Sequence, residues 1–119
     1  MDFKELRIWQ DSINLIVDVY KLIDNYPSTE RYGLSSQTGR SVNSIGANIA
    51  ESCGRYHYKD RINFLYHARG SLIETEHHLI VADKLGFISV GELAGLSKKI
   101  RDLGIRINNY IGSIKKSDN

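Results

Sequence analysis

Polar side chains between Gln37 and Arg55 recur at three- and four-residue steps, the spacing that gathers them on one side of a helix. The set consists of Gln37, Arg40, Ser44, Asn48, Glu51 and Arg55. Its arginines could hold phosphate groups, while Asn48 and Glu51 orient them. Glu51 and Arg55 also have the favourable order for a local ion pair, and the whole set could be a solvated face or a structural network between helices. Both interpretations stay open.

Two further charged residues, Arg69 and Glu76, lie seven positions apart between rows of apolar side chains. A charge flanked by apolar groups is costly to desolvate unless it is paired. We therefore interpret Arg69 and Glu76 as part of a structural or interfacial polar network.

The segment 98–119 is the most basic part of the chain. It holds six basic and two acidic side chains, a net charge of +4, whereas residues 1–30 hold three basic and six acidic ones, a net charge of −3. Lys98, Lys99 and Arg101 therefore join Arg40 and Arg55 as candidates for phosphate contact with a nucleic acid. The alternative is a solvated helix face that balances an acidic neighbour.

The residue patterns of known catalytic and metal sites are incomplete in this chain. Glu74 and His77 form a Glu-x-x-His step, but a di-iron bundle needs a second such step and the sequence has none. The single cysteine, Cys53, falls on the predicted apolar face of its helix, and no serine has a histidine and an acid at a recognisable spacing. We therefore predict a non-enzymatic protein without catalytic residues, metal or cofactor.

The apolar periodicity predicts four helices, at about 3–25, 35–53, 59–85 and 90–115, within one domain spanning 1–119. Pro27 interrupts the chain after the first helix, and Ser89 with Glu92 forms a capping box before the last one. No segment alternates with a period of two residues. Because the connections are short, we expect an all-α, antiparallel up-down-up-down four-helix bundle.

The first predicted helix carries two apolar rows. The row expected to face the core comprises Leu6, Trp9, Ile13, Ile16, Val17, Tyr20 and Ile23, and the second row comprises Ile8, Leu15, Val19 and Leu22. Together the rows cover roughly 220° of the helix, against about 100° for a surface helix. We expect the second row to face another subunit, so the protein would be a homo-oligomer.

Composition and hydropathy place limits on the environment of the chain. Its 119 residues are 41% hydrophobic and 25% charged, which is ordinary globular usage. No apolar run approaches the ~18 residues of a membrane span, and the opening MDFKELRIWQ lacks the apolar core of a signal peptide. We expect a cytoplasmic protein with no membrane partner.

Three stretches resemble a known bacterial family of four-helix bundles, the 23S rRNA intervening-sequence proteins. They are FKELRIWQDSINLIVDVYKL, YGLSSQTGRSVNSIGANIAES and FLYHARGSLIETEHHLIVADKLG, so the resemblance covers about residues 3–88. It implies a homopentameric barrel similar to the accessory protein of diversity-generating retroelements, which binds nucleic acid and a reverse transcriptase through a basic surface.

Residues and resemblance together predict a self-associating helical scaffold that binds RNA, or a complex of RNA with an RNA-binding protein, through backbone phosphates. Such binding should weaken steeply as salt is raised, because counterions are released when phosphates are neutralised. The alternative is a protein-only interaction module with no nucleic-acid partner, whose contacts would survive nuclease treatment.

Overall fold

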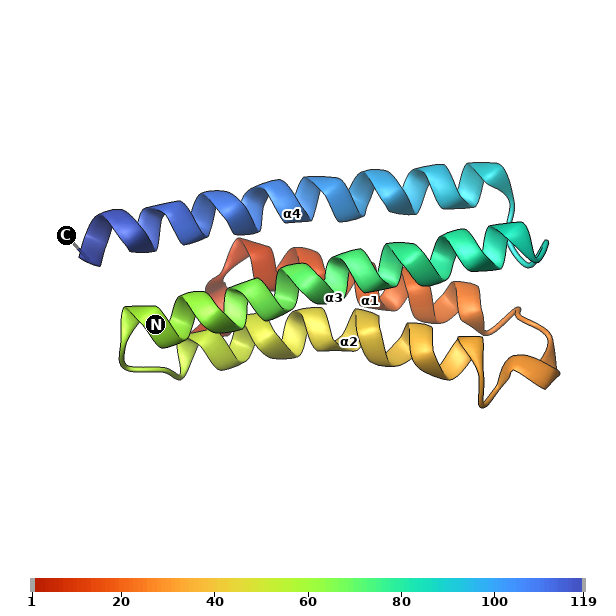
Figure 1. Ribbon diagram of the computed structural model, residues 1–119, viewed down its shortest axis with the longest axis horizontal. Coiled ribbons are helices and arrows are strands. Elements are labelled where there is room, and N and C mark those ends of the chain that lie inside the picture. The colour runs from red at the N-terminus through yellow and green to blue at the C-terminus, as the bar shows by residue number, and fades with distance from the viewer. Residues whose placement is uncertain (1, 119) are drawn as a thin grey trace.

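The computed structural model describes residues 2–118, and every element in this range is helical. The four α-helices are α1 (Arg7–Ile23), α2 (Leu34–Cys53), α3 (Tyr58–Lys84) and α4 (Val90–Asp118), with short 3-10 helices η1 (Phe3–Glu5) and η2 (Ser28–Glu30). Consecutive α-helices run in opposite directions along a bundle of 49 × 24 × 20 Å (Figure 1). The predicted all-α, up-down-up-down bundle is confirmed.

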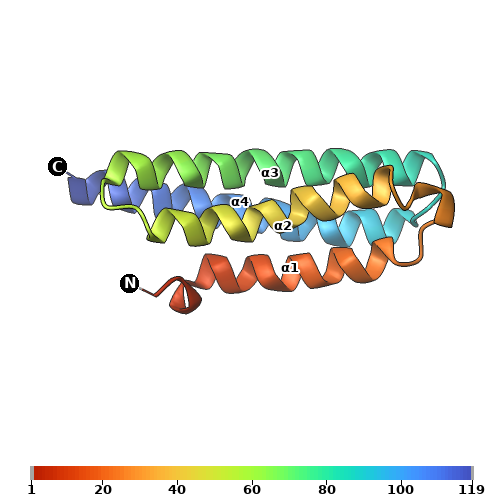
Figure 2. The same ribbon diagram turned by 90° about the horizontal axis from the view of Figure 1, so that it is seen from below.

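Each helix packs against two others, so the four form a closed set of neighbours. The pairs are α1 with α2, α2 with α3, α3 with α4, and α4 with α1. Figure 2 shows α1 and α3 at opposite edges of the bundle, with α2 and α4 between them. The outer faces of α1 and α3 therefore point in different directions, a relation that matters for the surfaces described below.

Local signals explain where α3 ends and α4 begins. Gly86 has φ of +80°, a conformation open mainly to glycine, and the backbone N–H of Phe87 donates to the carbonyl of Ala82 (2.9 Å) in a C-terminal cap. The predicted capping box is confirmed: the Glu92 N–H donates to Ser89 Oγ (3.0 Å) and the Ser89 N–H donates to a Glu92 carboxylate oxygen (2.9 Å).

The first helix begins later than predicted. Residues 3–5 form a separate 3-10 turn, and Leu6 is extended, with φ of −72° and ψ of 126°, so α1 starts only at Arg7. The Asp2 carboxylate accepts the Lys4 N–H (3.0 Å), and the Gln10 side chain donates to the Lys4 carbonyl (2.9 Å). These side chains form hydrogen bonds with the backbone N–H and carbonyl of Lys4, and so favour a separate turn over a continuous helix.

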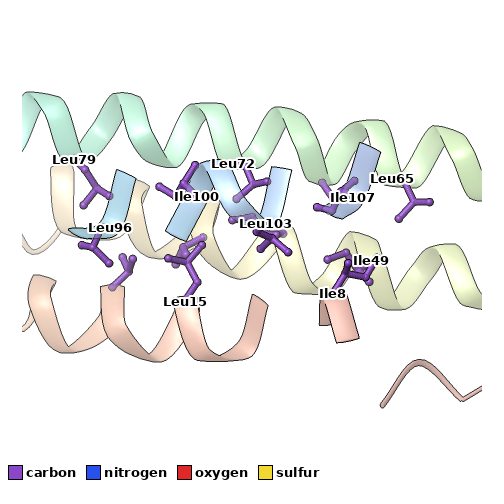
Figure 3. Close-up of a cluster of buried hydrophobic side chains, with 14 of the residues drawn as sticks. Ile8, Leu15, Ile49, Leu65, Leu72, Leu79, Leu96, Ile100, Leu103 and Ile107 are labelled. Carbon is purple, nitrogen blue, oxygen red and sulfur yellow. The ribbon is translucent and has the colours of Figure 1, made fainter. Parts of the chain in front are cut away.

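The core runs along the whole bundle and draws on all four helices. Figure 3 shows Leu72 and Leu79 of α3 meeting Ile100 and Leu103 of α4 in one apolar cluster. Other fully buried side chains are Val19, Val42, Ile45, Ile49, Leu65 and Ile107. Among residues 2–118, none of the helices has the combination of length and apolar character needed to cross a bilayer.

Both apolar rows of the first helix contribute to the core: the second row is the more deeply buried, and in the first row Val17 and Tyr20 are exposed whereas Leu6, Trp9, Ile16 and Ile23 pack against the core. Ile8, Leu15 and Val19 are 6%, 2% and 0% exposed and belong to the core, and Leu22 packs against it. Figure 3 shows Ile8 and Leu15 pointing from α1 into the apolar cluster. Their assignment to an oligomer interface is therefore wrong, because these side chains pack in or against the core of their own protomer.

Candidate functional site

The middle of the polar set on α2 is a structural network. The Asn48 side chain donates to the Ser44 carbonyl (2.8 Å) and to Ser44 Oγ (2.9 Å), while Ser71 of α3 donates to the same hydroxyl (3.0 Å). A second hydroxyl pair, Ser41 with Thr75 at 2.9 Å, is fully enclosed between the two helices. Ser44 thus links α2 to α3 through Ser71, whereas Asn48 supports Ser44 from within α2.

The residues at the two ends of the polar set on α2 take no part in this network. Arg55 pairs with Glu51 (2.6 Å), and its guanidinium lies 4.5 Å from the ring centre of Phe64. Glu51 is therefore engaged in the local ion pair rather than poised to orient a ligand. Gln37 and Arg40 are exposed at the other end of α2, where Arg40 makes no ion pair within the described chain.

Part of the basic C-terminal charge is neutralised inside the protomer. Lys99 Nζ lies 2.6 Å from an Asp18 carboxylate oxygen, and Arg106 lies 2.6 Å from Asp11, so α4 is joined to two acidic side chains of α1. Lys98 and Arg101 remain exposed, with no acidic partner in residues 2–118. For Lys99 the balancing acidic neighbour is thus the chain's own first helix.

The five candidates for phosphate contact do not form one surface. Arg40 and Arg55 lie on α2, whereas Lys98, Lys99 and Arg101 lie on α4. Helices α2 and α4 are diagonal in the bundle, and their backbones do not approach each other closely. The five candidates therefore fall into two separate regions of positive charge.

Arg69 and Glu76 line a groove of about 420 Å³ between α3 and α4. The Arg69 guanidinium donates to Asn108 Oδ1 (2.8 Å) and lies 5.0 Å from the ring centre of Tyr66. Glu76 is half-buried and has no ion-pair partner among the described residues. The floor of the groove is apolar and includes Leu72 and Ile100. Both charged residues are therefore placed at an apolar surface, as the sequence indicated.

Two exposed apolar side chains, Ile73 and Ile105, line this groove, and two more lie along α3 outside its lining. Tyr66, Ile73 and Ile80 repeat every seven residues on the exposed side of α3, and Ile105 projects from α4. Ile73 is 69% exposed and Ile105 is 59% exposed, values that are high for such apolar side chains. We call these four residues the α3–α4 patch.

A second apolar surface lies on α1. Val17 and Tyr20 are exposed, and with Ile16 they line a shallow hollow of about 440 Å³ whose rim carries Lys21 and Asp24. We call Ile16, Val17 and Tyr20 the α1 patch. It belongs to the row that was expected to face the core.

The pKa values of two tyrosines, Tyr66 and Tyr110, are shifted from the usual value for tyrosine. The hydrogen bond from Lys115 Nζ (3.1 Å) is the main cause that lowers the pKa of Tyr66, whereas burial raises the pKa of Tyr110. Lys115 and Arg69 both approach the Tyr66 ring, at 5.7 and 5.0 Å from its centre. These contacts hold the ring in place at the end of the α3–α4 patch.

The Glu-x-x-His step does not assemble a cluster of ligands. Glu74 contacts His78 Nε2 (3.2 Å) rather than His77, and His78 is buried. Within residues 2–118 no three histidine, cysteine or carboxylate side chains converge in a metal-binding arrangement.

The architecture and surfaces define a helical-bundle protein whose prominent surface features are apolar patches and separated basic regions. The chain belongs to the 23S rRNA-intervening sequence protein family, whose family model matches residues 4–109. This finding confirms the resemblance drawn from the sequence. No curated protein matches the chain.

A solved structure supports the same assignment. The chain is similar to a protein of unknown function from the S23 ribosomal protein family of Bacteroides thetaiotaomicron, with a TM-score of 0.78 and 25% sequence identity over 87% of this chain and 97% of that one. Neither the family description nor this relative's name describes an enzyme.

Proposed function

We propose that the protein is a non-enzymatic scaffold that assembles with itself, the α1 patch of one copy packing against the α3–α4 patch of the next. The observation that carries the proposal is the presence of two exposed apolar patches on diagonally opposed helices. Two different surfaces that fit each other make a head-to-tail contact, and such contacts form a ring when the rotation from one copy to the next closes. A ring of five copies accords with the resemblance stated above.

The charges around the patches suit this contact. Lys21 and Asp24 stand at the rim of the α1 patch, and Arg69, Glu76 and Arg101 stand around the α3–α4 patch. Each side therefore offers both signs of charge around an apolar centre. An apolar centre with a polar rim is the usual anatomy of a protein interface.

Light scattering of the purified chain, at several micromolar concentrations, tests the assembly. We expect a mass close to five times the 13.5 kDa of one chain. Ile73→Glu places a charge at the centre of the α3–α4 patch and should lower the mass while the helical circular dichroism stays unchanged. Val17→Glu should do the same from the α1 side, because a buried charge without a partner is strongly disfavoured.

The matched control is Val90→Glu, the same kind of change at an exposed position outside both patches. It should keep the wild-type mass. A wild-type chain that stays monomeric, or an Ile73→Glu chain that assembles like the wild type, would overturn the proposal.

RNA binding is the second candidate function, favoured by the exposure of Arg40, Lys98 and Arg101 and by their lack of ion pairs in the described structure. Repeating these cations around a ring would raise the local positive potential. A gel shift across a salt series tests it: affinity that is independent of salt, or absent at low salt, would exclude it. A partner that is captured equally well after nuclease treatment would favour the protein-only alternative.

A further inference from the structure

A hollow of about 390 Å³ lies where the end of α1 meets the start of α2, beside the connection coloured orange at one end of the bundle in Figure 1. It is lined by Tyr20, Ile23, Arg31, Tyr32, Ser35, Ser36, Gly39 and Arg40. Its volume falls within the ~300–1,000 Å³ of ligand sites. The set combines two guanidinium groups, two phenol rings and two hydroxyls, and nothing in the bundle's packing requires that combination.

The positive charge of the hollow is not neutralised. Arg31 and Arg40 are exposed, and neither forms an ion pair within residues 2–118. The nearest acid in the connection, Glu30, uses a carboxylate oxygen to accept the Leu34 N–H (3.2 Å) at the first turn of α2. Glu30 forms no ion pair with either arginine, so both guanidinium groups are available to an anion from solution.

An aromatic ring stands open beside these cations. Tyr32 is 87% exposed, and the Arg31 guanidinium lies 5.6 Å from its ring centre. Tyr20, a member of the α1 patch, forms the opposite wall and is held there by a hydrogen bond from its hydroxyl to the Gly39 carbonyl (3.4 Å). Arg31, Tyr32 and Arg40 belong to neither patch, so the groups that would contact a ligand do not depend on Tyr20 being uncovered. A Cβ on Gly39 would lie only 3.3 Å from that hydroxyl, so glycine preserves the shape of the wall.

We propose that this hollow binds single-stranded RNA, with a base stacked on Tyr32 and the adjoining backbone phosphates held by Arg31 and Arg40. An exposed aromatic face next to arginines is the combination by which proteins hold single strands. In a duplex the bases are stacked on one another and leave none free to lie on Tyr32. The inference rests on the RNA-binding candidate of the preceding subsection and adds to it a site and a form of RNA.

Fluorescence anisotropy with a labelled 12-nucleotide uridine strand, and with an RNA duplex of the same length, tests the site in full-length protein between 50 and 200 mM salt. We expect the single strand to bind more tightly. Tyr32→Ala should weaken it by about 5- to 150-fold, the usual range for loss of one stacked base. Tyr32→Phe keeps the ring and should bind like the wild type.

The contribution of the two arginines to RNA affinity is tested in a separate experiment. In the double variant Arg31→Gln/Arg40→Gln, the slope of log affinity against log salt should become shallower by about 1.4, as expected for two lost phosphate contacts on a single strand. Lys59→Gln/Lys116→Gln removes two exposed charges at the opposite end of the bundle and serves as the matched control, with the wild-type slope expected.

The possible outcomes distinguish failure of the proposed binding site from failure of RNA binding itself. Binding that Tyr32→Ala and the double arginine variant leave unchanged, but that Lys98→Gln/Arg101→Gln abolishes, would overturn the hollow and keep RNA binding. A duplex bound as tightly as the single strand would also overturn the hollow. A wild-type chain that binds neither RNA at 50 mM salt would overturn both.

Discussion

Tyr26 is a core residue whose polar group is left without a partner. Its ring packs against Phe87 at 5.6 Å between centres, and its hydroxyl is buried with no hydrogen-bond partner in the described part of the chain. Burial, and secondarily the nearby Glu92, raises the pKa of Tyr26 to about 12. An unsatisfied buried hydroxyl is a cost to stability, so this position is open to improvement.

We expect Tyr26→Phe to raise the free energy of unfolding by about 1 kcal/mol, because the ring packing remains and the unsatisfied hydroxyl is removed. Urea denaturation at neutral pH measures the change. Tyr20→Phe is a suitable comparison, since it removes a hydroxyl that does have an acceptor. A Tyr26→Phe protein that is less stable than the wild type would show that the hydroxyl has a partner in solution.

The same residue predicts a dependence on alkaline pH. The folded pKa, about 12, lies above the usual value of 10.0, so ionisation favours the unfolded chain. The stabilising contribution is fully present below pH 10 and is lost as pH rises towards 12. In urea titrations over this range the wild type should lose more stability than Tyr26→Phe does; equal losses would contradict the assignment.

The approach of α1 to α2 depends on a glycine. A Cβ on Gly46 would lie 3.0 Å from Ser12 Oγ and 3.1 Å from Ile16 Cδ1. Gly46→Leu should therefore destabilise the fold by about 1–3 kcal/mol through overpacking. Gly70→Leu, at an open helical position with nothing within 4 Å, should instead gain about 0.8 kcal/mol from helix propensity. Thermal unfolding of the two variants makes the comparison, and similar shifts would contradict it.

At the scale of the helices, apolar periodicity together with turn and cap residues predicted the four α-helices and most of their ends. The ends of α2 and α3 lie within one residue of the predicted ends, because glycine and the turn segments on either side leave few alternatives. The start of α1 was missed because the Asp2 and Gln10 side chains satisfy a separate turn that apolar spacing cannot reveal.

The inner face of α1 could not be chosen from its own sequence. Both rows are apolar, and Ser12 lies on the inner one, where a polar residue argues against burial. In the structure Ser12 is fully buried because its hydroxyl donates to the Trp9 carbonyl (2.6 Å) and its small side chain meets Gly46. The deciding signal was a pair of small residues on two helices, which no single-helix pattern contains.

The candidate site was predictable only in part. Arg40 was singled out from its spacing on α2, but Arg31 and Tyr32 lie in the connection before that helix, where no periodicity applies. Their meeting with Arg40 and Tyr20 depends on how the connection folds back between two helices. Residue types in a loop indicate which chemistry is available but do not indicate which helix they will lie beside.

The capping box at the start of α4 gives a prediction at this scale. Ser89→Ala removes the side chain that accepts the Glu92 N–H and should lower the free energy of unfolding by about 1 kcal/mol. Ser113→Ala is the matched control within the same helix, because its exposed hydroxyl only donates to the Tyr110 carbonyl (2.7 Å). Urea denaturation should show little loss for the control, and equal losses would argue against the cap.

At the scale of the whole molecule, helices α1 and α4 share the least extensive contact of the four packed pairs. A hollow of about 230 Å³ runs along the seam between them, lined by charged residues that include Asp11, Lys99 and Arg106. The ion pairs that cross this seam are partly exposed, and each such pair is worth about 0–1 kcal/mol. Helices α2 and α3, by contrast, share the most extensive contact in the bundle.

We therefore expect amide hydrogens of α1 to exchange faster than those of α2 and α3. The Ile73→Glu variant is the appropriate sample, because neighbouring copies would otherwise protect α1. Raising the salt to about 1 M shortens the screening length to about 3 Å and should speed exchange in α1 while leaving central α3 amides unchanged. Uniform exchange across the helices, or no effect of salt, would contradict this description of the seam.

The diagonal placement of α1 and α3 has a geometric consequence for the assembly. Each added copy is turned relative to the one before it, and closure after five copies needs a turn of about 72° without a rise along the axis. A substitution in the core that alters how α1 crosses α2 would change that turn, although it touches neither patch. In the proposed assembly, a substitution at Gly46 would therefore influence whether the copies close into a finite ring or continue as an open-ended fibre.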